Sequence, residues 1–178
     1  MPSRSNKLEN LIKRLVLISG KDHLNIHGKK MSDHYICFIP TVHDFIPSKE
    51  SQKLAIEILK RHKLKVLEVT VDKNTTFRDC GENFESIHCP HCKSKIKIEY
   101  WSELMNKNYS DENGFSINPL LMPCCHNIST LNDLCYKFPM GFSRFILRTD
   151  DQVKVSDLLI TELESAIKCK LRVIYKMC

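Results

Sequence analysis

The chain has 178 residues, a length typical of one domain that carries an insertion. Hydrophobic residues make up 42% and charged residues 27%, with only 5 Gly and 7 Pro, which excludes disordered, collagen-like and low-complexity proteins. Its apolar runs are too short for a membrane-spanning helix or a secretory signal, so we expect a cytoplasmic protein.

The net charge of +6 is concentrated in residues 1–30. This segment has seven basic and two acidic residues, a net charge of +5, so the other 148 residues carry +1. Apolar residues recur at helical spacing at Leu8, Leu11, Ile12 and Leu15. We therefore expect residues 1–30 to form a basic amphipathic helix appended to a nearly neutral body at 31–178.

The first part of the body has the pattern of a β-α-β unit. Residues 35–39 are a continuous apolar run that ends at Pro40, as in a buried strand. Ser48 is a suitable N-cap for a helix over 48–62, and residues 64–71 are rich in β-branched side chains.

The end of the chain repeats this pattern. A strand is expected over 142–147, a helix capped by Ser156, and a strand over 171–177. Two such units, with halves at 31–72 and 140–178, predict an α+β fold on the ferredoxin-like split β-α-β plan.

Residues 73–139 lie between the two units and contain six of the nine cysteines. Ile96, Ile98 and Tyr100 alternate with polar residues, which predicts a strand. The Thr130-x-x-Asp133 pattern predicts a capping box before a short helix. Because large aliphatic residues are few here, we expect this insertion to need a further source of stability.

Two short cysteine motifs supply that source, Cys89-Pro90-His91-Cys92 and Pro123-Cys124-Cys125-His126. Their spacing is typical of a zinc-ribbon-like subdomain, in which two turns share one tetrahedral Zn²⁺. The expected ligands are Cys89, Cys92, Cys124 and Cys125. Because Cys124 and Cys125 are adjacent, Cys80 or His126 is an alternate fourth ligand. Four thiolates leave no position for water, which favours a structural ion, whereas the alternative interpretation is thiols without a metal.

The first motif has a second interpretation. Cys-Pro-His-Cys is also the active-site sequence of oxidising thiol-disulfide oxidoreductases, in which the first cysteine lies at a helix N-terminus. The alternation at 96–100 predicts that no helix begins there, which disfavours this chemistry. H-E-x-x-H and the glycine-rich nucleotide-binding motifs are missing from the sequence, so other catalytic templates have no support.

The middle of the chain resembles a family of uncharacterised bacterial proteins. The resemblance covers roughly residues 79–147 and is carried by Cys89-Pro90-His91-Cys92, Pro123-Cys124-Cys125, the run 131–136 and the run 139–145. His126 stands where that family is expected to have Gly, which makes it a poorer candidate ligand. The family implies no known activity, so the resemblance supports the metal site alone.

One set of residues near the end of the insertion is a candidate interaction surface, because aromatic residues beside an arginine are typical of interaction hot spots. These residues are Asn132, Asp133, Tyr136, Phe142 and Arg144. The alternative is a core that is covered by a loop.

Three functions are consistent with these patterns. The leading hypothesis is a non-enzymatic zinc-binding adaptor or inhibitor module that recognises another protein, with structural Zn²⁺. The second is nucleic-acid binding through residues 1–30, the basic run 60–65 and the lysines at 93–97, although the nearly neutral body argues against it. The third is an enzyme, through thiol-disulfide exchange at Cys89 or hydrolysis at an incompletely ligated zinc.

Overall fold

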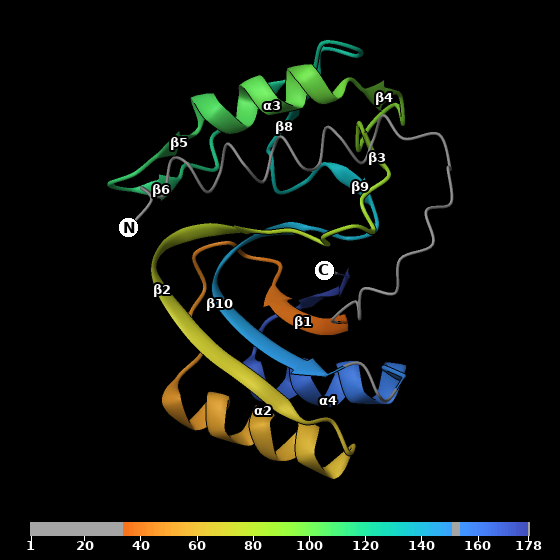
Figure 1. Cartoon of the computed structure of the whole chain (residues 1–178). Coiled ribbons are helices and arrows are strands. Elements are labelled where there is room, and N and C mark those ends of the chain that lie inside the picture. Colours follow the sequence, from red (N-terminus) through yellow and green to blue (C-terminus); the bar gives the residue numbers. More distant parts are fainter. Residues whose placement is uncertain (1–33, 151–153, 178) are drawn as a thin grey trace, which may run out of the picture.

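The computed structural model describes residues 34–150 and 154–177 and shows an α+β fold (Figure 1). Three helices and eleven strands lie within these residues. None of these helices has the length and apolarity that crossing a membrane would require. The expected basic helix at 1–30 lies outside the described residues.

The first β-α-β unit consists of β1 (His34–Pro40), α2 (Lys49–Arg61) and β2 (Val66–Arg78). Helix α2 begins as the sequence predicts, because the Ser48 side chain accepts a hydrogen bond from the Ser51 N–H at 3.1 Å. Strand β2 continues seven residues beyond its expected end at 71. This extension carries the strand into the range 73–139 that the sequence assigns to the insertion.

The second unit consists of β10 (Gly141–Asp150), α4 (Asp157–Ile167) and β11 (Leu171–Met177). Ser156 caps α4 by accepting from the Leu159 N–H at 3.2 Å. The strands of the two units pair antiparallel in the order β11-β1-β10-β2. Two short strands, β6 (Gly114–Phe115) and β5 (Tyr109–Ser110), extend this sheet to six strands, and β6 pairs parallel with β2, so the sheet is mixed.

Both faces of the central sheet are covered. Helices α2 and α4 lie on one face, and the insertion with helix α3 (Ile98–Lys107) lies on the other (Figure 1). Strand β1 shows why its sequence is continuously apolar: Ile36 and Phe38 belong to the core on the helix side, and Cys37 and Ile39 to the core on the insertion side.

The insertion contains eight short elements between β2 and β10. They are β3 (Ser86–His88), β4 (Lys95–Ile96), α3 (Ile98–Lys107), β5 (Tyr109–Ser110), β6 (Gly114–Phe115), β7 (Leu120–Leu121), β8 (Ile128–Ser129) and β9 (Cys135–Lys137). Strands β4, β3 and β9 form a three-stranded sheet, and β7 pairs with β8 in a separate hairpin.

The expected strand over 96–100 is wrong. Strand β4 ends at Ile96, and helix α3 begins at Ile98. Trp101 and Met105, four residues apart, are the buried residues on the inner face of α3. The alternation of Ile96, Ile98 and Tyr100 therefore spans the junction of a strand and a helix.

The short helix expected after Thr130 is also not formed. Residues 130–133 make a tight turn in which the Asp133 N–H donates to the Thr130 carbonyl at 3.1 Å. The Thr130 hydroxyl donates to the Asp133 carboxylate at 2.6 Å, so it does not cap a helix. The chain then enters β9, which pairs with β3.

An aromatic cluster joins the insertion to the sheet. Phe77 on β2 and Phe142 on β10 have ring centroids 5.0 Å apart, and Phe115 on β6 lies 5.0 Å from Phe142. Trp101 on α3 lies 5.8 Å from Phe77. Because these rings are buried together, the insertion and the sheet share one hydrophobic core.

Candidate metal centre

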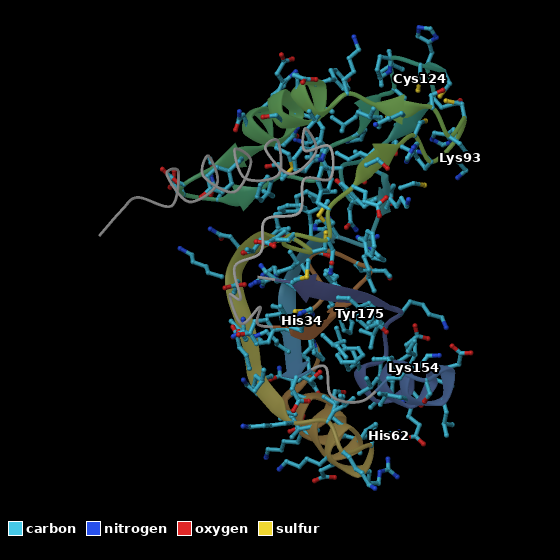
Figure 2. The ribbon with its side chains drawn as sticks, turned by 45° about the vertical axis from the view of Figure 1, so that its right-hand side comes forward. His34, His62, Lys93, Cys124, Lys154 and Tyr175 are labelled. Atoms are coloured by element: carbon cyan, nitrogen blue, oxygen red, sulfur yellow. The ribbon has the colours of Figure 1, made fainter. Side chains whose placement is uncertain are left out.

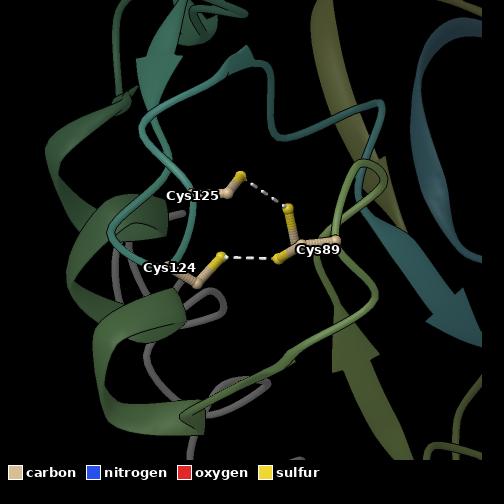
Figure 3. A group of neighbouring side chains, drawn as sticks. Cys89, Cys124 and Cys125 are labelled. Atoms are coloured by element: carbon tan, nitrogen blue, oxygen red, sulfur yellow. Dashed lines mark hydrogen bonds between the residues drawn. The ribbon is translucent and has the colours of Figure 1, made fainter.

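Four cysteine sulfurs converge at the end of the insertion that lies far from α2 and α4 (Figures 2 and 3). The Sγ atoms of Cys89, Cys92, Cys124 and Cys125 all lie within 4.8 Å of one another. Cys89 Sγ is 3.6 Å from Cys125 Sγ, and Cys92 Sγ is 3.3 Å from Cys124 Sγ. The structure therefore brings together the four ligands that the sequence predicts.

The first two sulfurs are held by a turn that follows β3. The Cys89 N–H donates to the Ser94 carbonyl at 2.9 Å, and the Lys93 N–H donates to the Cys89 carbonyl at 3.1 Å. Lys93 has φ +61°, the left-handed conformation that closes the turn. This closed loop directs Cys89 and Cys92 to the same side.

The other two sulfurs are held by the turn between β7 and β8. The Met122 N–H donates to the Asn127 carbonyl at 2.9 Å, and the His126 N–H donates to the Met122 carbonyl at 2.9 Å. His126 has φ +58°. A hydrogen bond of 2.9 Å between His91 Nε2 and the Ile128 carbonyl ties the first turn to β8.

The site stabilises negative charge on the sulfurs of the first turn, Cys89 and Cys92. The hydroxyl and backbone N–H of Ser94, hydrogen-bonded to Cys92 Sγ, together with Cys124 lower the pKa of Cys92 to about 6. Burial opposes ionisation of Cys89, but the backbone N–H groups of Cys92 and His91 leave its pKa below the ordinary value. The hydrogen bond with Cys92 raises the pKa of Cys124 to about 12. Cys92 thus favours the thiolate and Cys124 the thiol, and a bound cation would displace the proton of Cys124.

The donor set and its dimensions fit a zinc ion. Tetrahedral coordination with Zn–S bonds of about 2.3 Å places the sulfurs about 3.8 Å apart. The sulfur separations of 3.3 and 3.6 Å lie close to this value, and the others do not exceed 4.8 Å. Four soft thiolates favour Zn²⁺ over the hard divalent cations. This cluster could therefore hold a metal ion such as zinc.

The alternate ligands do not belong to this cluster. Cys80 is buried in the core between the sheet and the insertion, and burial followed by the charge of Asp79 raises its pKa to about 12. His126 is exposed at the end of its turn. Among the residues 34–150 and 154–177, the group of side chains that can hold a metal consists of the four cysteines alone.

The redox interpretation requires a helix that begins at the first cysteine. Helix α3 does follow the motif, although the sequence predicts no helix here, but it begins at Ile98, six residues after Cys92. Cys89 and Cys92 lie in the turn between β3 and β4 instead. The helix N-terminus that activates the first cysteine of thioredoxin-like enzymes is thus missing from this turn.

The expected interaction surface is divided between core and surface. Asn132 and Phe142 are buried, with 6% and 0% of their area exposed, and thus cannot contact a partner directly. The Tyr136 hydroxyl donates to the Leu131 carbonyl at 2.8 Å inside the protein. Asp133 is exposed, and half-buried Arg144 donates from Nε to the Asp72 carbonyl at 3.2 Å.

The basic residues of the body do not form one patch. Figure 2 shows Lys93 beside Cys124 at one end of the molecule and His62, within the basic run 60–65, at the other. Lys93 Nζ is bound to the Pro90 carbonyl at 2.7 Å, and Arg61 is paired with Glu162 at 3.3 Å. The two described clusters therefore lie apart, and Arg61 is paired with an acidic side chain.

The comparisons with known proteins identify no family. No family model matches the chain, and neither a curated protein nor a solved structure matches it. The resemblance to uncharacterised bacterial proteins thus stays a prediction, and the metal site depends on the geometry of the four cysteines.

Two residues of the site are missed by the sequence analysis. Ser94 Oγ lies 3.3 Å from Cys92 Sγ, and Asn127 Nδ2 donates to Cys125 Sγ at 3.5 Å. Each follows the second cysteine of its turn by two residues. Pro90 and Pro123 occupy the same place in the two turns. Aligning the two segments on these prolines would have placed Ser94 and Asn127 at equivalent positions.

Proposed function

We propose that this protein is a zinc-binding, non-enzymatic interaction module in which one Zn²⁺ is structural. The observation that carries this proposal is the convergence of the Sγ atoms of Cys89, Cys92, Cys124 and Cys125 within 4.8 Å of one another. Four thiolates saturate a tetrahedral ion, so no site is left for a reacting water. The energy of metal binding then stabilises the fold.

The position of the cluster supports a structural role. The two turns lie far apart in sequence, and outside their sulfurs the described contact between the two segments is the hydrogen bond from His91 Nε2 to the Ile128 carbonyl. A shared ion would join the β3–β4 turn to the β7–β8 hairpin. Since Cys89 and Met122 also belong to the core between the insertion and the sheet, that core would be fixed at its outer end.

The body of this module follows the ferredoxin-like plan in our proposal. Two observations support it: the antiparallel order β11-β1-β10-β2, and one helix in each of the segments β1-α2-β2 and β10-α4-β11. The metal-bearing insertion covers the face of the sheet opposite α2 and α4. Free thiolates need a reducing environment, which is consistent with a cytoplasmic location.

The proposed partner is another protein, in an adaptor or inhibitor interaction. Leu121 and Ile128 are direct cross-strand partners on the β7–β8 hairpin, and 62% and 68% of their areas are exposed. This hairpin carries Cys124 and Cys125 in its turn, so a bound ion would hold the apolar pair in place. Exposed aliphatic pairs on a rigid hairpin favour contact with an apolar protein surface.

Elemental mass spectrometry of the purified, reduced protein tests the metal site. We expect one zinc per chain in wild type and in Cys169→Ser, a matched control on a half-buried cysteine distant from the site. We expect none in Cys89→Ser or Cys125→Ser. Chelation of the ion should shift the emission of the single tryptophan, Trp101, as the insertion loosens. A wild-type protein without bound metal would contradict the proposal.

A further inference from the structure

The two turns of the metal centre have the same backbone hydrogen bonds. In the first turn we number Cys89 as position 1. The N–H of position 1 donates to the carbonyl of position 6, and the N–H of position 5 donates to the carbonyl of position 1. The second turn repeats both bonds when Met122 is position 1. All four bonds measure between 2.9 and 3.1 Å.

The side chains repeat as well. Position 2 is proline in both turns, Pro90 and Pro123. Position 5 has a left-handed backbone in both, with φ +61° at Lys93 and +58° at His126. Position 6 places a polar group against the sulfur of position 4 in both, at 3.3 Å for Ser94 and 3.5 Å for Asn127. The two segments are therefore two copies of one metal-binding turn.

The ligands break this repeat at one place. In the first turn they occupy positions 1 and 4, Cys89 and Cys92, whereas in the second they occupy positions 3 and 4, Cys124 and Cys125. Met122 occupies position 1 and His91 is the counterpart of Cys124. The sulfur distances agree with a ligand at position 3 in place of position 1. Cys124 Sγ lies 3.3 Å from Cys92 Sγ, much as Cys89 Sγ lies 3.6 Å from Cys125 Sγ.

The displaced ligand changes the exposure of the site. Cys89 at position 1 is fully buried, and so is Met122, whereas Cys124 at position 3 is exposed. Cys92 is exposed too. The pair Cys92 and Cys124 therefore faces solvent, whereas in the pair Cys89 and Cys125 the first sulfur is buried and the second is half-buried.

We propose that the ion is exchangeable on the side of Cys92 and Cys124. The reason is that the second turn carries its ligand at the exposed position 3, Cys124, and not at the buried position 1, Met122. This inference rests on the proposed zinc site. In the exchange step a donor atom of a competing chelator or thiol binds the ion as the bond between the ion and Cys124 Sγ breaks. The released thiolate takes a proton from water, and no electron is transferred. A small-molecule thiol or a metal-accepting protein would thus reach the ion without unfolding of the core.

The test moves the ligand back to position 1. The double variant Met122→Cys, Cys124→Ser should bind Co²⁺ with the absorption of a four-thiolate site, because the two turns are equivalent. Transfer of zinc from this variant to a chromogenic chelator should be slower than from wild type, on the order of tenfold. Met122→Leu, which keeps Cys124 and the buried apolar side chain, should release zinc at the wild-type rate.

Two results would overturn the inference. A folded double variant without a four-thiolate spectrum would show that positions 1 and 3 are not interchangeable, and one that releases zinc as fast as wild type would show that exposure does not limit exchange. Where the variant does not fold, alkylation of zinc-loaded wild type decides. Cys124 should react before Cys89, and equal reaction rates would contradict the proposal. A wild-type protein that binds no zinc would instead reject the underlying metal site.

Discussion

Arg172 on β11 donates from Nη1 to the side-chain oxygen of Asn132 at 2.9 Å, which joins the last strand of the sheet to the turn before β9. The same guanidinium donates to the Met140 carbonyl at 2.8 Å. Asn132 in turn donates to the Thr41 carbonyl at 2.8 Å and accepts from the Phe142 N–H at 3.1 Å. One buried amide therefore connects β11, the segment after β1 and the start of β10.

Replacement of this amide should destabilise the protein strongly. In Asn132→Ala the Arg172 guanidinium and the Phe142 N–H both lose an acceptor in a buried place. We expect the free energy of unfolding to fall by about 3 kcal/mol. Urea unfolding of the metal-loaded protein, followed by Trp101 emission, measures this change. The exposed Asn118→Ala is the control and should change the stability by less than about 0.5 kcal/mol. Equal effects of the two substitutions would contradict the connecting role of Asn132.

The aromatic cluster should contribute on a similar scale. Phe142 is fully buried and packs against Phe77 and Phe115, both at 5.0 Å between centroids. We expect Phe142→Ala to lower the free energy of unfolding by about 3–5 kcal/mol, because it leaves a cavity where the insertion meets the sheet. Phe138 has 38% of its area exposed, and Phe138→Ala should cost less than about 1 kcal/mol. Thermal unfolding of the two variants distinguishes these outcomes, and a Tm near that of wild type for Phe142→Ala would argue against a shared core.

The sequence predicts the two β-α-β units well because both faces of the sheet and the inner faces of α2 and α4 are filled by regular apolar patterns. It fails at α3, where the alternation of Ile96 with Ile98 crosses a strand end and conceals the helical spacing of Trp101 and Met105. It leaves open whether Asn132 and Phe142 belong to an interaction surface or to a core under a loop, because their contacts with Arg172 and Phe77 cannot be read from the sequence. These contacts join segments that are distant in sequence, so no local pattern reports them.

The metal site was predictable in its residues and not in its geometry. Cysteine spacing indicates Cys89, Cys92, Cys124 and Cys125, and it is the folded cluster that leaves out the alternates Cys80 and His126. That Met122 occupies the place of Cys89 depends on backbone hydrogen bonds that only the folded turns display.

The buried thiol of Cys80 should make stability depend on alkaline pH. Burial raises its pKa from 9.0 to about 12, so the folded state keeps the proton while the unfolded chain loses it above pH 9. The stability contributed by this group is complete below pH 9 and falls as the pH rises toward the folded pKa. The slope is about 1.4 kcal/mol per pH unit in this window. Urea unfolding of wild type and Cys80→Ala at pH 8, 9, 10 and 11 measures it, because the variant should show a shallower decline by this amount. Parallel declines for the two proteins would contradict the burial of the thiol.

Titration of the reduced, metal-free protein with Co²⁺ tests whether four thiolates surround one structural ion, as we propose. We expect saturation at one equivalent, with the visible bands of tetrahedral Co²⁺ and strong thiolate-to-cobalt charge transfer that Zn²⁺ abolishes. Cys89→Ser and Cys125→Ser should weaken the charge-transfer band, whereas Cys169→Ser should leave it unchanged. A weak octahedral spectrum, or a full tetrathiolate spectrum in Cys89→Ser, would contradict the four-cysteine metal site.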